Sequence, residues 1–137
     1  MLALLRLLFV DPPLARLRLR CAVVLYLAIL VLGSIPGARA DIGQVASGWV
    51  LHSAAYAGLT LLIFGGVDAR SGRGARALIA FASIAAMGAL DETVQSFFPY
   101  RGAAVGDWLI DCAAACVSAS LLYLLWPRLA RSAIAAA

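Results

Sequence analysis

The amino-acid sequence predicts an all-α, polytopic membrane protein with four transmembrane helices and an interfacial N-terminal helix. Of its 137 residues, 64% are hydrophobic and 13% are charged, whereas soluble domains have about 45–50% apolar and about 25% charged residues. The mean hydropathy is +0.97. Arginines lie between and beside four apolar stretches. Most acidic residues lie at or near one end of these stretches. A soluble globular fold is excluded, because so few polar residues cannot cover a water-facing surface.

The first two predicted spans are residues 21–35 and 49–64. A transmembrane helix needs about 20 mainly apolar residues, because the hydrocarbon layer is about 30 Å thick and each helical residue rises about 1.5 Å. Arginine side chains in residues 17–20 can snorkel to the headgroups before the first span, and Pro36 ends this span. Both spans are short, which leaves a tilted helix or a thin bilayer open.

The third and fourth predicted spans, residues 77–98 and 107–126, are full length. Pro99 is predicted to end the third span and Pro127 the fourth, because proline has no backbone N–H and disfavours a helical residue before it. The segments between spans are short and rich in Gly, Ser, Ala, Pro and charge. They are too short to form a further domain.

The segment before the first span is predicted to lie at the membrane surface. Residues 1–10 are apolar but too few to cross a bilayer, and the helix-breaking residues 11–13 follow them. We therefore divide the chain into a cytoplasmic or interfacial segment (1–20), a four-helix transmembrane domain (21–126) and a cytoplasmic tail (127–137).

A cleavable signal peptide is a second interpretation of the N-terminal region. Its basic start, its apolar run and the small residues Ala38 and Ala40 are also typical of a secretory signal that is cleaved after Ala40. The topology of the remaining spans is the same in both interpretations.

The arginines predict the orientation, since basic residues near span ends are retained on the cytoplasmic side. Only Arg39 and Arg101 fall in the loops after the first and third spans. We therefore expect both termini to lie in the cytoplasm. The net charge of +4 favours anionic lipid surfaces over nucleic acid. The other nine basic residues are Arg6, Arg16, Arg18, Arg20, Arg70, Arg73, Arg76, Arg128 and Arg131.

Polar residues recur four residues apart near the outer end of the last three predicted spans. Such residues share one helix face and lie about 6 Å apart along the axis. A carboxylate in hydrocarbon costs about 2.5–3.5 kcal/mol even on insertion scales, so it needs a partner, a proton or a water-filled recess. We expect these groups to converge on a pocket open to the outer face. They are His52 and Tyr56 on the second span, Asp91, Glu92 and Gln95 on the third, and Asp107 and Asp111 on the fourth.

A purely structural network is the alternative explanation of this cluster. In that network Arg101 would tie acidic residues of different spans together and would only hold the helices in place. The acidic residues concerned are Asp91, Glu92 and Asp107.

The same residues carry a family resemblance. The pattern consists of Asp91, Glu92, Gln95, Phe98, Pro99, Arg101 and Asp107, preceded by His52 and Tyr56 on an upstream span. Over residues 33–122 it resembles the VanZ-like family of small bacterial membrane proteins. The family takes its name from a member linked to resistance to the glycopeptide teicoplanin, other members are tied to the cell envelope, and no reaction is established for it. The resemblance implies a protein of the bacterial inner membrane with a role in the cell envelope, and it implies that the polar residues are the functional positions.

The chain also departs from the family pattern. An Asp-Lys pair usually precedes the histidine, and Gly48 and Trp49 stand in that place here. Any role of the pair is therefore missing or displaced to Asp41. An asparagine common after the last aspartate is Asp111, and a later glycine is Ala115. Asp111 adds a charge at the deepest polar position.

An enzyme acting on an outer-leaflet amphiphile, such as a lipid-linked envelope precursor, is one functional hypothesis. His52 or Glu92 would donate or accept a proton, while Asp107 and Asp91 would orient that group or hold a divalent cation. Arg101 would bind a phosphate through its fork of N–H groups. The candidate catalytic residues are His52, Asp91, Glu92 and Asp107, and the candidate binding residues are Tyr56, Gln95, Arg101 and Asp111.

A non-enzymatic binding or accessory subunit is the second hypothesis. Its anionic pocket would hold a cationic ligand or a membrane-protein partner. Transport is a third, but it requires a polar path through both leaflets, and the inner halves of the last two spans offer only Ser83, Ser118 and Ser120. The sequence therefore argues against transport.

Overall fold

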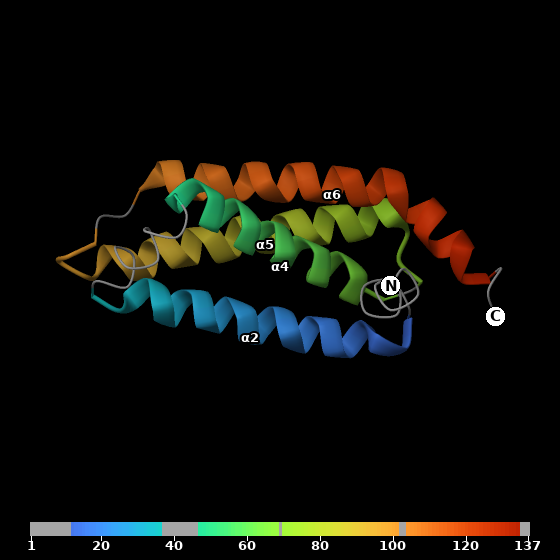
Figure 1. Cartoon of the computed structure of the whole chain (residues 1–137), viewed down its shortest axis with the longest axis horizontal. Helices are drawn as coiled ribbons and strands as arrows, with labels where there is room; N and C mark the ends of the chain where they lie inside the picture. Colours follow the sequence, from blue (N-terminus) through green and yellow to red (C-terminus); the bar gives the residue numbers. More distant parts are fainter. Residues whose placement is uncertain (1–11, 37–46, 69, 102–103, 135–137) are drawn as a thin grey trace.

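The computed structural model describes residues 12–36, 47–68, 70–101 and 104–134. Its long α-helices lie side by side in an antiparallel bundle (Figure 1). Each is long and apolar enough to cross a membrane, and this result confirms the all-α prediction. The described elements are a 3-10 turn, η1 (Pro12–Leu14), and four α-helices, α2 (Ala15–Ser34), α4 (Gly48–Gly66), α5 (Arg73–Ser96) and α6 (Val105–Ile134). The predicted interfacial helix at residues 1–10, the cleavage site after Ala40 and Asp41 lie outside the described residues.

The first two spans are longer than the sequence predicted. Residues Pro12–Ser34 form a candidate span of 23 residues and Gly48–Gly66 one of 19 residues. At about 1.5 Å per residue, the shorter one covers about 28 Å, close to the thickness of the hydrocarbon layer. The predicted first span was too short because it left the arginines before Cys21 outside the helix, whereas α2 includes them. The predicted second span ended before Gly65 and Gly66, which α4 includes.

The prediction that Pro127 ends the fourth helix was also wrong. Helix α6 continues through Pro127 and bends toward its red C-terminal end (Figure 1). Proline cannot donate to the carbonyl four residues earlier, which belongs to Tyr123. Arg73 Nη1 donates to that carbonyl instead, over 3.4 Å, and its guanidinium lies 4.5 Å from the centroid of the Tyr123 ring. The Tyr123 carbonyl, which Pro127 cannot pair, therefore accepts a hydrogen bond from α5.

Two buried arginines cap the last turn of α4. The final carbonyls of a helix have no partner within it and carry the negative end of the helix dipole. Arg18 Nη1 of α2 donates to the Gly65 carbonyl at 2.6 Å, and Arg76 Nη1 of α5 donates to the Phe64 carbonyl at 3.2 Å. We call this end of the bundle, marked by Arg18, Arg73 and Arg76, the arginine end.

A glycine brings α2 and α4 into close contact at the arginine end. A Cβ added to Gly66 would lie 2.7 Å from side-chain atoms of Leu19 and 3.2 Å from the carbonyl oxygen of Ala15. In Figure 1, α4 runs obliquely, from beside α6 at one end of the bundle to beside α2 at the arginine end. Helices α2 and α4 therefore diverge toward the opposite end, which we call the carboxylate end because it holds Asp91, Glu92, Asp107 and Asp111.

An apolar core fills the middle of the bundle. Its buried residues are small or aliphatic side chains from all four helices together with two tyrosines and a phenylalanine. Large apolar side chains cover the outer surface, for example Val24 (67% exposed) and Leu78 (68% exposed). Such a surface suits contact with lipid tails. The core residues are Ala22, Tyr26, Tyr56, Leu59, Ile63, Phe64, Ala80, Ile84 and Ala115.

We expect Arg18→Ala to destabilise the protein more than Arg16→Ala or Arg20→Ala. All three variants remove one positive charge from α2, but Arg18 is 2% exposed and caps Gly65, whereas Arg16 and Arg20 are exposed. Loss of a hydrogen bond from a charged donor costs about 1.5–3 kcal/mol. The thermal unfolding midpoint in detergent measures the difference. Equal midpoints for the three variants would show that Arg18 does not cap α4.

Candidate functional site

The carboxylate end buries four acidic side chains. Asp91 is 1% exposed, Glu92 8%, Asp107 9% and Asp111 0%. They come from the last turns of α5 and the first turns of α6. An ionised carboxylate buried in an apolar bundle is costly unless other groups satisfy its oxygens. The contacts of each carboxylate therefore decide what this end of the bundle can do.

His52 and Asp111 join α4 to α6. Nδ1 of His52 lies 3.0 Å from Oδ1 of Asp111, and the His52 ring stacks on the Tyr56 ring with centroids 6.1 Å apart and planes at 11°. A carboxylate at Nδ1 fixes the orientation of an imidazole and leaves Nε2 as the atom that exchanges a proton. The sequence suggested Asp91 or Asp107 for this orienting contact. The geometry gives it to Asp111.

Gly88 of α5 makes room for Asp111. A Cβ at this position would lie 3.1 Å from Oδ2 of Asp111 and 3.1 Å from Cδ1 of Trp108. Trp108 Nε1 donates to the Ala85 carbonyl at 3.0 Å and holds α6 against α5. The second oxygen of Asp111, Oδ2, is buried without a hydrogen-bond partner in the described part of the chain.

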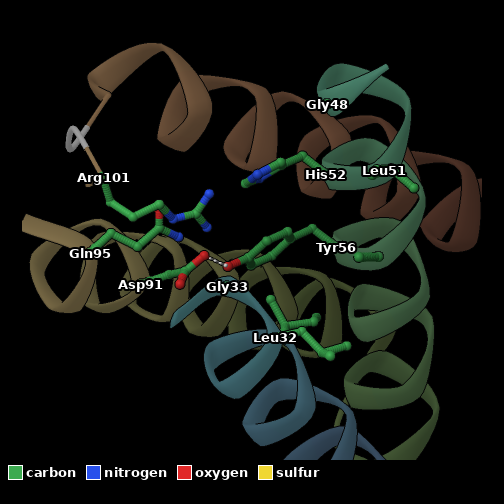
Figure 2. A pocket seen from close by; sticks show the side chains of 11 residues that line it. Leu32, Gly33, Gly48, Leu51, His52, Tyr56, Asp91, Gln95 and Arg101 are labelled. Carbon is green, nitrogen blue, oxygen red and sulfur yellow. Dashed lines mark hydrogen bonds between the residues drawn. The ribbon is translucent and has the colours of Figure 1, made fainter. Parts of the chain in front are cut away.

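Asp91 joins α5 to α4 through Tyr56. The Tyr56 hydroxyl donates to Oδ2 of Asp91 at 3.3 Å, as the dashed line in Figure 2 shows. Oδ1 of Asp91 has no hydrogen-bond partner among the described residues. Beyond Tyr56, the buried polar side chains of the described residues are Thr60, whose hydroxyl bonds the Tyr56 carbonyl of its own helix, and the capping arginines Arg18 and Arg76 at the arginine end.

Glu92 makes a contact that positions α6. Its Oε2 accepts the backbone N–H of Ala104 at 2.6 Å. The Ala104 carbonyl in turn accepts the N–H groups of Asp107 and Trp108 at 2.8 and 3.4 Å, so Ala104 immediately precedes α6 and pairs with its first turn. Glu92 therefore ties the start of α6 to the end of α5. This contact favours a positioning role over the proton transfer that the sequence also suggested.

Arg101 follows α5 and points its guanidinium into a pocket beside Gln95 and opposite His52 (Figure 2). Its Nε and Nη1 are buried and make no hydrogen bond with any described residue. Gly33 of α2 leaves space for it, because an added Cβ would lie 3.3 Å from Arg101 Nη2, 3.5 Å from Gln95 Nε2 and 3.8 Å from Asp91 Oδ1. These two free nitrogens do not support the alternative in which Arg101 only ties the acidic residues together.

The pocket has a volume of about 380 Å³ and lies between α2 and α4 at the carboxylate end. Side chains of α2 and of one face of α4 give it apolar walls, namely Ile29, Leu32, Leu51 and Ala55. Its polar lining comes from α4, α5 and the segment after α5, namely His52, Tyr56, Asp91, Gln95 and Arg101. A cavity with both kinds of wall suits an amphiphile.

The eight candidate residues thus fall into two groups. Five line the pocket, and three, Glu92, Asp107 and Asp111, lie behind it. Asp107 is in the first turn of α6, where the helix dipole favours a carboxylate. Sequence reasoning placed the pocket on the second to fourth spans and missed the contribution of α2. The signal that could have revealed it is Gly33, a glycine inside a predicted span where no turn requires one.

The donor set does not favour a metal centre. No three His, Cys, Asp or Glu side chains within the described ranges are placed to hold a metal ion together. The divalent cation considered from the sequence therefore gains no support from these residues, and the chemistry of the pocket is derived without it.

The chain matches no protein-family model, no curated protein and no solved structure.

We expect the His52–Asp111 contact to contribute a measurable coupling energy. In a double-mutant cycle of His52→Ala and Asp111→Asn, residues in direct contact should show a coupling of about 0.5–3 kcal/mol. The free energy of unfolding in mixed detergent and SDS measures it. A cycle of His52→Ala with Asp68→Asn is the control, since the exposed Asp68 lies at the arginine end. Additive effects in both cycles would contradict the contact.

Proposed function

We propose that this chain is a VanZ-like integral protein of a bacterial inner membrane that acts on an amphiphile of the outer leaflet, such as a lipid-linked envelope component. The observation that carries the proposal is the placement of His52. Its ring is oriented by Asp111 and lines a pocket that also holds the free N–H groups of Arg101. An oriented imidazole beside a free guanidinium is suited to proton transfer on a phosphate-bearing molecule.

The proposed membrane orientation places the arginine end in the cytoplasm. The arginine counts on the two sides support this placement. Both termini would then be cytoplasmic, and the pocket would open near the outer headgroups. The apolar side chains on the outside of the bundle support a position within the bilayer.

The proposed reaction uses His52 as the proton-transferring group. Arg101 would hold a phosphate oxygen of the amphiphile, and the apolar part of the molecule would lie along Leu32 and Leu51. His52 Nε2 would accept the proton of an attacking water or hydroxyl and return it to the leaving group, while Asp111 stabilises the charged ring. Such acid–base catalysis accelerates a reaction by about 10²–10⁴-fold.

The chain's likeness to the VanZ-like pattern supports an envelope role. Residues of the pattern that are far apart in the sequence lie at one end of the bundle, since Tyr56 bonds Asp91 and Glu92 bonds the start of α6. The family assignment remains part of the proposal.

A binding or accessory subunit is the second candidate function. The observation that favours it is Asp91 Oδ1, a buried carboxylate oxygen without a partner in the described structure, on a residue that lines the pocket. Such an oxygen suits a cationic group on a ligand or on a partner protein. In this case the pocket would hold its ligand and no bond would change.

We expect His52→Ala and Asp111→Asn to abolish turnover of an envelope-lipid extract by the reconstituted protein. Wild-type protein in vesicles should convert one lipid species to a product of different mass, and loss of the acid–base group should slow this about 10²–10⁴-fold. Mass spectrometry of the lipids measures the product.

Asp68→Asn is the matched control, because it removes an exposed carboxylate at the opposite end of the bundle. Each variant is compared at equal protein level in the membrane. Product formation by His52→Ala at the wild-type rate would refute the catalytic role. Saturable lipid binding by the wild type without any product would favour the binding subunit.

A further inference from the structure

A hydrogen-bond donor and an acceptor are left unpaired in the same pocket. Nε and Nη1 of Arg101 and Oδ1 of Asp91 are buried and have no hydrogen-bond partner among the described residues. Leaving such groups unsatisfied costs about 1–3 kcal/mol each, and more when they are charged. Both residues line the pocket, so a ligand in the pocket is the natural partner for both.

The two groups lie close to one another. A single point, the Cβ position of Gly33, is 3.3 Å from Nη2 of Arg101 and 3.8 Å from Oδ1 of Asp91. Gln95 adds a third polar group, since its Nε2 is 3.5 Å from the same point. The polar part of the pocket therefore presents positive and negative groups side by side.

The charge around the pocket argues against a purely anionic ligand. Asp91 is buried in its lining, and Glu92, Asp107 and Asp111 are buried behind it. A phosphate bound at Arg101 without a compensating positive charge would meet repulsion from Asp91. A ligand with a positive charge beside its phosphate avoids this repulsion and also satisfies Oδ1.

We infer that the pocket binds a zwitterionic lipid headgroup in which a phosphate adjoins a primary ammonium, as in an ethanolamine phospholipid. The inference rests on the proposed function and names the class of the amphiphile. The phosphate pairs with Arg101 and Gln95, and the ammonium donates to Oδ1 of Asp91. The acyl chains lie along the apolar side chains of α2 and α4, represented by Leu32 and Leu51.

The ammonium must carry an N–H donor for this arrangement. A primary ammonium has three N–H donors, whereas a quaternary ammonium has none and is bulkier. A phosphoglycerol headgroup has a phosphate without any positive charge. Comparison of phosphoethanolamine with phosphocholine therefore tests the hydrogen bond to Asp91. Comparison with phosphoglycerol tests the positive charge, and all three headgroups keep the phosphate.

The test uses short-chain dihexanoyl lipids with phosphoethanolamine, phosphocholine or phosphoglycerol headgroups, added to the full-length protein in detergent. The shift of the thermal unfolding midpoint with lipid concentration gives the apparent dissociation constant. We expect the phosphoethanolamine lipid to bind about tenfold or more tightly than the other two, the ratio that corresponds to one hydrogen bond to a charged group. Free phosphoethanolamine, which has no chains, should bind more weakly than the lipid.

Two charge-removing variants test the assigned contacts. Arg101→Gln and Asp91→Asn should each remove the preference for the phosphoethanolamine lipid. Arg20→Gln and Asp68→Asn are the controls, because they remove the same charges from exposed residues at the arginine end. Both should retain the preference for the phosphoethanolamine lipid.

A third variant tests the pocket without changing its charge. Gly33→Leu places a side chain against Arg101, Gln95 and Asp91 and should abolish the midpoint shift. Because Gly33 is in a helix, this substitution should not weaken the helix itself. Gly58→Leu is its control, since a Cβ at Gly58 meets nothing within 4 Å.

Equal affinities for the three lipids, or an unchanged preference in Gly33→Leu, would overturn the inference. Failure of the proposed function gives a different result, because the phosphoethanolamine lipid would then bind to the wild type and no product would form. If instead the envelope extract is turned over while all three lipids bind equally, the proposed function stands and the inference fails.

Discussion

An ionisable side chain buried in an apolar helix bundle must find its partner on another helix, and this constraint shapes the molecule. His52 meets Asp111 of α6 at the carboxylate end. Arg18 of α2 meets the last turn of α4 at the arginine end. Helix α4 is thus held beside α6 at one end and beside α2 at the other, which fixes its oblique path (Figure 1). The pocket lies where this path separates α4 from α2.

Glycines allow these polar contacts to form where larger residues would block them. Gly66 lets α2 approach α4 closely, and Gly88 lets Asp111 lie against α5. Gly33 has the opposite effect, because its missing side chain leaves space for the guanidinium of Arg101. The same residue type therefore closes the bundle at two positions and keeps it open at a third.

The pocket places a proton-transferring group beside charged groups that can bind a ligand. His52, backed by Asp111, offers a proton acceptor. Arg101 and Asp91 offer unpaired groups of opposite charge. The apolar side chains of α2 complete a cavity that can enclose both parts of an amphiphile, and a bundle without α2 would leave that cavity open. The helix that carries the fewest polar candidates therefore has a direct part in the site.

The sequence by itself determined the properties that depend on local pattern. Apolar length predicted the spans, and four-residue spacing placed His52, Asp91 and Asp111 on helix faces at one depth. It could not determine which of them meet, because the rotation and tilt of each helix are set by packing between helices. Tertiary structure alone decided that His52 pairs with Asp111, that α6 passes through Pro127 with Arg73 as the replacement donor, and that α2 forms a wall of the pocket. Each of these three features depends on contacts between residues that are distant in the chain. Hydropathy and periodicity describe only neighbouring residues, so they cannot predict such contacts.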